Sequence, residues 1–366
     1  MTKRHLFVVP TAKINGAERV LFNLASYLLR KGDHITLVTM SRGKSTDGWN
    51  ELERYSSFKW IIGTRGSEKA SLLPITTQLF KLNLSEDFDY LLSTHIHVNY
   101  YLTTLKRLGL FKKAKLISRD SHAPFERYES YTKIITYKLI YRYLYGKQDL
   151  LICQTQLMKD SLIYNLGFKP AKKVEVIPNP VNLSYITSKI VTSSKEKIIV
   201  FCGRLVEIKQ PHLLIDAFSN FSINHPEYRL IFLGDGPLRA ELEYQTKTLK
   251  ISEKVRFLGK VKNPYAWFSK SEIGVISSRT EGFPNVLLEM MAAGTSKIVT
   301  TPCTGGLNDI PGLIVTANNS SSESILDGLN KAAMLNKSFA STYQNYVIEH
   351  HTVESFWRNT VRLLNN

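Results

Sequence analysis

The chain has 366 residues, of which 43% are hydrophobic and 22% are charged, and its formal net charge is +17. We expect a soluble globular protein of two domains, because each half is long enough to bury a core of its own. The cysteines, at positions 153, 202 and 303, are widely spaced and lack metal-ligand spacing, which argues against a disulfide framework and favours reduced thiols in a cytoplasm.

The first half of the chain predicts a doubly wound unit of alternating strands and helices. We recognise neither a signal peptide nor a long apolar span ahead of the first strand, at 6–9, and therefore expect a cytoplasmic protein. Asn15 followed by Glu18 resembles a capping box at the start of a helix that ends at Gly32. Later strands are expected at 35–39, 90–94, 115–118 and 150–153.

Two histidines, His95 and His97, alternate just after the strand at 90–94, with Asn99 beyond them. A His-x-His pair can bind a metal ion, but no third ligand has matching spacing, so we interpret both residues as pocket lining or structure. We therefore expect no metal site.

The second half of the chain repeats strand–glycine–helix units, which predicts another parallel sheet with helices on both faces. Strands are expected at 198–202, 229–233, 255–258 and 272–276. Two cations, Arg204 and Lys209, follow the first of these strands. Ligands bind beyond the carboxyl ends of parallel strands, so these cations are candidate ligand contacts. Their ordinary alternative is a pair of solvated loop charges.

Seven residues separate two carboxylates, Glu281 and Glu289, that bracket the start of a predicted helix. Pro284 suits the first turn of that helix. A helix start attracts phosphate through its backbone N–H groups, here those near Asn285, Val286 and Leu287. The spacing therefore suggests a nucleotide diphosphate at the helix start, with one carboxylate near the reacting group and one for a ribose. The alternative is an exposed glutamate followed by a mid-helix glutamate.

Five motifs in order resemble the retaining family 4 glycosyltransferases of the GT-B fold. They are N-G-A-E-R-V at 15–20, V-I-P-N-P-V at 176–181, G-R-L-x3-K at 203–209, G-D-G-P-L-R-x2-L-E at 234–243 and S-R-T-E-G-F-P-N-V-L-L-E-M-M-A-A-G at 278–294. The resemblance implies an α/β fold of two doubly wound Rossmann-like domains that face each other across a cleft. Residues 1–180 would bind the acceptor, 181–345 the nucleotide sugar, and a helix within 346–366 would cross back to the first domain.

The resemblance also implies a donor site that needs neither a metal ion nor a cofactor. Arg204 and Lys209 would stabilise the leaving phosphate, Glu281 would face the donor sugar and diphosphate, and Glu289 would bind the ribose. The remaining donor contacts implied are Gly16, Gly282, Phe283, Asn285, Val286 and Leu287. Retention of the anomeric configuration is a further implication of the family.

The acceptor side departs from the family pattern. Relatives carry a glycine where this chain has Asn15, and they place a histidine after a first-domain strand at the position of Asp120. His122 lies two residues farther on and is a candidate catalytic residue, with an exposed loop histidine as the alternative. Asn15, Asn99, Arg119 and Asp120 are the acceptor-side candidates.

The positive charge is concentrated in the first half of the chain. Residues 1–185 contain 28 basic and 15 acidic residues, and 104–147 contain 11 basic, 3 acidic and several tyrosine residues. A basic, tyrosine-rich segment can lie on an anionic membrane surface. A solvated face over a core is the competing interpretation, and nucleic acid is disfavoured because no known nucleic-acid module accompanies the charge.

Together these features predict a cytoplasmic, peripherally membrane-associated hexosyltransferase. We expect it to transfer a hexose or N-acetylhexosamine from a nucleotide sugar, with a UDP-sugar as the expected donor. The acceptor would be a lipid-linked oligosaccharide in the synthesis of a surface polysaccharide such as an O-antigen, a capsule or a lipopolysaccharide. The alternatives are a GT-B epimerase or phosphorylase and a non-catalytic membrane or nucleic-acid binder. The sugar, the linkage, the base, the acceptor, the oligomeric state and the choice between Asp120 and His122 stay open.

Overall fold

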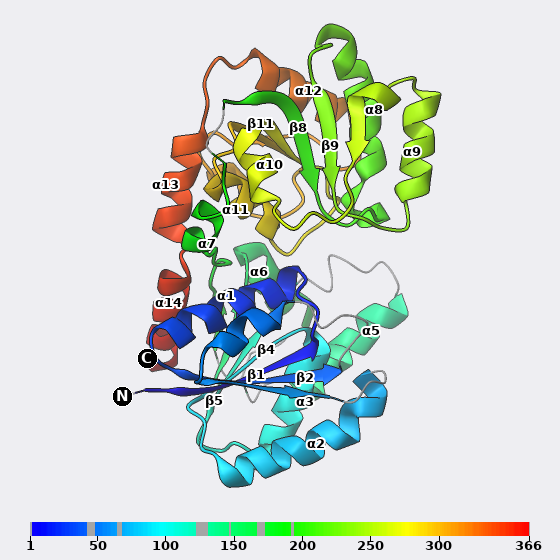
Figure 1. The fold of residues 1–366 in the computed structure, drawn as a ribbon. Coiled ribbons are helices and arrows are strands. Elements are labelled where there is room, and N and C mark those ends of the chain that lie inside the picture. Colours follow the sequence, from blue (N-terminus) through cyan, green and yellow to red (C-terminus); the bar gives the residue numbers. More distant parts are fainter. Residues whose placement is uncertain are drawn as a thin grey trace. The chain divides into compact units, whose positions relative to one another are not determined.

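A computed structural model (Figure 1) describes residues 2–41, 48–63, 68–121, 131–145, 148–166, 173–191 and 194–365. The chain divides into two compact units: unit 1 is Met1–Pro180 with Val353–Asn366, and unit 2 is Val181–Thr352. Each unit contains its own sheet of parallel strands with helices packed on it. The predicted α/β class, with two doubly wound parallel-sheet domains, is confirmed.

Unit 1 is built on a seven-stranded sheet in the order β3-β2-β1-β4-β5-β6-β7. The strands are β1 Arg4–Thr11, β2 His34–Ser41, β3 Phe58–Ile62, β4 Tyr90–Thr94, β5 Lys115–Arg119, β6 Leu150–Cys153 and β7 Lys173–Val176. The chain adds strands on one side of β1 and then on the other. The sheet therefore has a switch point between β1 and β4, where ligands of such sheets bind.

Helices cover both faces of this sheet, because successive side chains of a strand point to opposite faces. The described helices of unit 1 are α1 Gly16–Arg30, α2 Glu68–Ser85, α3 Ile96–Arg107, α5 Tyr131–Leu139 with the π-helical turn η2 Ile140–Leu144, α6 Gln156–Leu166 and α14 Val353–Asn365. Phe7 and Val9 pack in one core cluster with α1 and α14, while Leu6 and Val8 pack in another with α2 and α3.

The last helix, α14, is an integral part of unit 1. Its Phe356 is buried in the cluster that α1 also forms. The Trp357 ring lies edge-on to Tyr90, with 5.1 Å between ring centroids, and Lys173 Nζ donates a hydrogen bond to the Leu363 carbonyl at 2.8 Å. Apolar residues of the C-terminal helix thus pack against the core formed by the amino-terminal part of the chain.

Unit 2 has a six-stranded sheet in the order β10-β9-β8-β11-β12-β13. The strands are β8 Glu196–Cys202, β9 Arg229–Leu233, β10 Val255–Phe257, β11 Ser271–Ile276, β12 Lys297–Thr300 and β13 Ile314–Val315. Its helices are α7 Leu183–Thr187, α8 Pro211–Asn224, α9 Arg239–Thr248, α10 Tyr265–Lys270, α11 Asn285–Ala292, α12 Ser322–Met334 and α13 Ala340–His350. Alternate β8 residues again face different clusters: Val200 packs with α10, α11 and α13, and Phe201 packs with α8 and α12.

Across the described part of the chain, no helix combines the length and the apolar content that a bilayer crossing requires.

Two loops of unit 2 meet through their backbones at the carboxyl ends of β8 and β9. The Gly203 N–H donates to the Leu233 carbonyl at 2.9 Å, and the Leu205 N–H donates to the Asp235 carbonyl at 3.1 Å. Gly234 has φ +133°, and a Cβ atom there would lie 2.0 Å from the Gly203 carbonyl oxygen. The G-D-G motif is therefore a packing requirement of the loop that carries Arg204.

Gly234→Ala should destabilise unit 2, because the substitution adds a steric clash to a backbone conformation that favours glycine. We expect a loss of about 2 kcal/mol or more and a drop of several degrees in melting temperature. Gly203→Ala is the matched control, since its Cβ would meet only the Phe201 ring, at 3.5 Å. Equal melting temperatures for the two variants would contradict this account.

Candidate functional site

The donor-site candidates of unit 2 gather at the carboxyl ends of β8 and β11. Lys209 lies in the short 3-10 turn Glu207–Lys209 after β8, and Glu281 lies in the loop after β11. Their side chains form an ion pair, with Lys209 Nζ against Glu281 Oε1. The side chains are 24% and 16% exposed, so the pair borders solvent. The structure therefore brings together two residues that lie 72 positions apart in the sequence.

Hydrogen bonds fasten the two loops around this ion pair. Ser278 Oγ donates to Glu281 Oε1 at 2.7 Å, and Ser277 Oγ donates to the Lys209 carbonyl at 2.7 Å. The Arg279 N–H donates to the Ile208 carbonyl at 2.9 Å. Ser277 and Ser278, which our sequence analysis did not select, thus set the position of the selected pair. A hydroxyl and an ammonium group share one Glu281 oxygen, so the carboxylate is oriented before any ligand arrives.

The segment after Glu281 is also held from several sides. The Glu281 N–H donates to the Cys303 carbonyl at 2.8 Å, and Thr304 Oγ1 donates to the Gly282 carbonyl at 2.7 Å. The Phe283 ring stacks on the His351 ring, with 6.1 Å between centroids. These contacts fix the conformation of the segment that leads into α11.

Helix α11 begins at Asn285, so Pro284 precedes its first turn instead of lying in it. Pro284 is the N-cap, with φ −74° and ψ 105°, and Asn285 is the first helical residue. Pro284 therefore restricts the backbone conformation of the residue just before the helix, and it is not part of the first turn. The Leu287 N–H donates to the Pro284 carbonyl at 3.0 Å, and the Leu287 side chain is buried. Of the three amides expected to bind an anion, that of Leu287 is therefore engaged within the helix start.

Glu289 lies one turn inside α11 and faces the carboxyl end of β8. Its charge acts on the Cys202 thiol, the last residue of β8, whose pKa is raised to about 12 by burial first and by Glu289 second. A neutral thiol is thus expected beside this carboxylate. Arg204 lies on the following loop with an exposed side chain. Glu289 and Arg204 thus belong to the elements that meet at the carboxyl end of β8.

In unit 1, three of the acceptor-side candidates form one buried network. Asp120 is 1% exposed, and its Oδ2 accepts a hydrogen bond from the Tyr141 hydroxyl at 2.6 Å. Its Oδ1 accepts from Asn99 Nδ2 at 3.1 Å and from the Tyr145 hydroxyl at 3.2 Å. Both carboxylate oxygens are therefore occupied inside the protein. Asn99 is equally enclosed, since Ser93 Oγ donates to its Oδ1 at 2.7 Å.

Arg119 is 3% exposed and extends the same network. Its Nη2 donates to Asn179 Oδ1, and Asn179 Nδ2 donates to Gln154 Oε1 at 2.8 Å. Burial lowers the pKa of Arg119 to about 10, against the opposing effect of Asp120. The sequence analysis did not select Gln154 or Asn179 for this network, although Asn179 belongs to the motif at 176–181.

The remaining first-domain candidates lie at the start of α1. Asn15 and Gly16 are exposed, and the Asn15 N–H donates to Glu18 Oε2 at 3.1 Å, which is one half of the expected capping box. Glu18 itself is 2% exposed, and its Oε1 lies 2.7 Å from His95 Nε2. The sequence analysis selected neither partner of this contact as a site residue. His122 lies outside the described residues.

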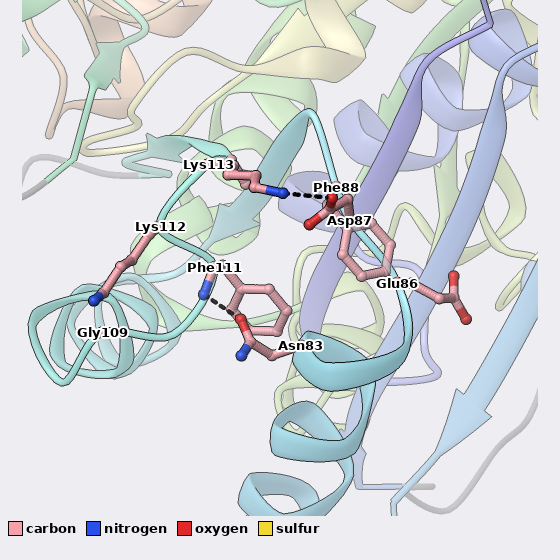
Figure 2. A pocket seen from close by; sticks show the side chains of 9 residues that line it. Asn83, Glu86, Asp87, Phe88, Gly109, Phe111, Lys112 and Lys113 are labelled. Carbon is pink, nitrogen blue, oxygen red and sulfur yellow. Dashed lines mark hydrogen bonds and ion pairs between the residues drawn. The ribbon is translucent and has the colours of Figure 1, made fainter.

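A pocket of about 230 Å³ opens at the amino ends of β4 and β5, away from all of these candidates. Figure 2 shows Lys113 reaching Asp87 and the Phe111 backbone reaching Asn83, at 2.8 and 2.5 Å. Two of the charged groups of its rim, Lys113 and Asp87, thus pair with each other. Among the described residues we find no group of three or more histidine, cysteine, aspartate or glutamate side chains that could hold a metal ion.

The buried Asp120 makes the stability of unit 1 depend on pH. Burial raises its pKa to about 6, and hydrogen bonds from Tyr141, Tyr145 and Asn99 oppose that shift only in part. The pKa of Asp120 is higher in the folded protein than in the unfolded chain. Its contribution to the free energy of unfolding is therefore fully present below about pH 4 and is lost as pH rises through about 6.

Asp120→Asn should remove this dependence. The stability of the wild type relative to the variant should fall by about 3 kcal/mol, in order of magnitude, between pH 4 and 7. Melting temperatures of both proteins across that range provide the measurement. Parallel pH curves would show that Asp120 titrates in the folded protein as it does in the unfolded chain.

Solved structures share this fold over the whole chain. Anabaena HepE in complex with UDP and glucose matches with a TM-score of 0.79 and 17% identity, covering 99% of both chains. The trehalose-6-phosphate synthase OtsA matches with a TM-score of 0.80 and 13% identity, again over 99% of both chains. These structures have the GT-B fold of glycosyltransferases.

Comparisons of sequence are more specific. "Glycosyltransferase Family 4" matches residues 14–185, and "Glycosyl transferases group 1" matches residues 186–345. A Campylobacter jejuni N-acetylgalactosamine-N,N'-diacetylbacillosaminyl-diphospho-undecaprenol 4-alpha-N-acetylgalactosaminyltransferase is 30% identical over 61% of this chain and 62% of its own length. A second enzyme of the same organism is 30% identical over 78% of this chain and 76% of its own length. Its name is GalNAc-alpha-(1->4)-GalNAc-alpha-(1->3)-diNAcBac-PP-undecaprenol alpha-1,4-N-acetyl-D-galactosaminyltransferase. The chain belongs to the family 4 glycosyltransferases.

Proposed function

We propose that this glycosyltransferase moves a hexose or N-acetylhexosamine from a UDP-sugar to a lipid-linked oligosaccharide, with retention of configuration and without a metal ion. The observation that carries the proposal is the Lys209–Glu281 pair, which is fixed beside the start of α11 with Arg204 on the neighbouring loop. The names of the two Campylobacter relatives support a lipid-linked saccharide as acceptor. The UDP bound to HepE supports the choice of nucleotide.

In this proposal the cations of unit 2 stabilise the leaving diphosphate. Arg204 and Lys209 supply two positive charges where negative charge develops, which is the role a metal ion has in other transferases. The start of α11 adds the positive end of a helix dipole. Glu289 accepts hydrogen bonds from the ribose hydroxyls, as a carboxylate at this sheet edge does in nucleotide-binding folds.

Glu281 and Lys209 then exchange partners when the donor binds. The Lys209 ammonium turns from the carboxylate to the diphosphate, and Glu281 becomes available to the hydroxyls of the donor sugar. The bond from the anomeric carbon to the phosphate oxygen breaks, and a bond to the acceptor oxygen forms on the same face. The proton of the acceptor hydroxyl passes to the departing phosphate, so no protein nucleophile is needed.

Unit 1 has the acceptor-binding role in this proposal. Of its three buried candidates, Asn99 and Asp120 hydrogen-bond to one another, and Arg119 is held through its Nη2, which donates to Asn179 Oδ1. They therefore act by fixing the carboxyl edge of the sheet. Asn15, which is exposed at the start of α1, remains the acceptor contact of the proposal.

We further propose that unit 1 rests on the anionic inner face of the cytoplasmic membrane. Apolar side chains are exposed on α2 and on the α5–η2 segment, with Leu73 at 78%, Leu84 at 76%, Leu139 at 51% and Tyr143 at 60%. Arg107 Nη2 donates to the Tyr145 carbonyl at 2.6 Å and so ties the end of α3 to that segment. Exposed cations, among them Lys81, Lys138 and Arg142, accompany these side chains. Apolar side chains mixed with cations are typical of surfaces that bind anionic lipid.

Replacing the two carboxylates should separate catalysis from nucleotide binding. Glu281→Ala should lower transfer at least about a hundredfold with little change in UDP affinity, because it removes a contact to the sugar. Glu289→Ala should weaken UDP about tenfold or more, because it removes the ribose contact. Rates with radiolabelled donor and calorimetric UDP affinities give both values. Glu243→Ala, on α9, is the control, and full activity in both site variants would overturn the assignment.

Reversing charge on the α5–η2 segment should release the protein from anionic vesicles. Lys138→Glu with Arg142→Glu should lower the partition coefficient about tenfold or more, since each cation near such a surface contributes about 1 kcal/mol. Lys247→Glu with Lys250→Glu, on exposed positions of unit 2, changes the net charge equally and should leave binding near the wild-type level. Vesicle sedimentation at fixed ionic strength measures both. Unchanged binding of the first variant would refute the membrane proposal.

A further inference from the structure

His95 follows the last residue of β4, at the carboxyl edge of the unit 1 sheet and next to its switch point. In the register of the sheet, Thr94 pairs with Arg119, so the residues that come next, His95 and Asp120, emerge from neighbouring strands. The Asp120 carboxylate is closed off by its three hydrogen-bonding neighbours, whereas the His95 side chain is 26% exposed. Of this pair, the imidazole is the titratable group that a ligand at the edge can reach.

A buried carboxylate fixes this imidazole from behind. His95 Nε2 lies 2.7 Å from Glu18 Oε1, and the other oxygen of Glu18 accepts the Asn15 N–H at 3.1 Å. Burial alone would raise the pKa of Glu18, but the hydrogen bond and charge of His95 and the backbone N–H groups outweigh it, so the pKa is lowered. Glu18 is therefore ionised at neutral pH and accepts a hydrogen bond from Nε2–H. This contact fixes both the tautomer and the plane of the ring.

The second ring nitrogen faces outward. Within the described part of the chain, Nδ1 of His95 has no hydrogen-bond partner, and it is not among the buried polar atoms that lack one. With Nε2 carrying the proton toward Glu18, Nδ1 of the neutral ring presents a lone pair. A lone pair at the edge of the sheet accepts a hydrogen bond from a hydroxyl group.

The backbone at His95 also departs from ordinary geometry. Its φ is +76° and its ψ is 131°, a conformation that residues other than glycine seldom adopt. Strained residues of this kind persist where the surroundings hold them, and they cluster at ligand sites. Here the conformation places the ring between the end of β4 and the first turn of α1, where Glu18 holds it.

We propose that His95 contacts the saccharide substrate and accepts a hydrogen bond from a hydroxyl of the acceptor sugar through Nδ1. This inference rests on the proposed function, because it takes unit 1 as the acceptor-binding unit. Glu18 is the positioning residue, since it touches only the imidazole and the start of α1.

Two substitutions distinguish a contact of His95 with the substrate from a purely structural role, in which His95 only binds Glu18 at the start of α1. In His95→Gln the amide nitrogen reaches the place of Nε2 and keeps the hydrogen bond to Glu18, while nothing replaces Nδ1. In His95→Asn the amide oxygen takes the place of Nδ1, while the contact with Glu18 is lost. His34→Gln, at an exposed position at the start of β2, is the matched control.

The test measures binding of octyl glycosides of N-acetylgalactosamine, N-acetylglucosamine and glucose by saturation-transfer NMR, with and without UDP. UDP affinity is measured separately by calorimetry, and melting temperatures verify folding. We expect the wild type to bind at least one glycoside and His95→Gln to weaken that binding about tenfold, the loss expected for one hydrogen bond. His95→Asn should stay within about threefold of the wild type, and the UDP affinity should be the same in all variants.

The opposite order of glycoside binding, in which His95→Gln binds like the wild type and His95→Asn does not, would overturn the proposal in favour of a purely structural role for His95. Equal binding by all variants, or no glycoside binding by a wild type that binds UDP, would also overturn it and would leave the donor assignment standing. Glycoside binding by a wild type that does not bind UDP would contradict the proposed function instead, and the comparison of the His95 variants would still decide the role of Nδ1.

Discussion

Parallel pairing of strands is the constraint on which the rest of this structure depends. Every strand pair in the described sheets is parallel, so the carboxyl ends of the strands in each unit meet at one edge. The interior strands are buried on both faces and can carry little but apolar side chains. Polar chemistry is therefore placed on the loops and helix starts at that edge, as Lys209 and Glu281 are in unit 2 and His95 and Glu18 are in unit 1.

The two edges solve the problem of holding charge in different ways. In unit 2 the Lys209–Glu281 pair borders solvent, and the neighbouring serines orient it at little desolvation cost. In unit 1 the edge is built over a buried network in which Asp120 receives two tyrosine hydroxyls and an amide. A buried carboxylate with both oxygens hydrogen-bonded is costly to disturb, so it suits the rigid support of a site. The groups left for ligands are those that remain partly exposed above it.

Much of this architecture follows from the sequence. Buried strands punctuated by glycine predicted two parallel sheets, and the motif at 278–294 predicted the loop and helix that carry Glu281 and Glu289. The helix implied within 346–366 packs in unit 1, since Phe356 of α14 lies in the core of that unit. These features are local, so the order of residues is enough to reveal them.

What the sequence could not reveal depends on contacts between distant residues. Asp120 looked like an acceptor contact because it takes the position of the family's histidine, and only the fold brings Tyr141, Tyr145 and Asn99 around it. Glu18 and His95 are 77 positions apart, and no pattern in either segment announces their contact. Pro284 as an N-cap is a smaller case, since a shift of one residue lies below the precision of pattern reading.

The central claim is that unit 2 binds a uridine nucleotide through its own side chains. The most direct test is the melting temperature of the wild type with UDP, GDP or ADP, each in the presence of EDTA. A ligand at about 100 times its dissociation constant stabilises the folded state by about 2.7 kcal/mol, which gives a shift of a few degrees. The account predicts such a shift with UDP despite the chelator. A folded protein that responds to none of the three nucleotides, or to UDP only when EDTA is omitted, would contradict it.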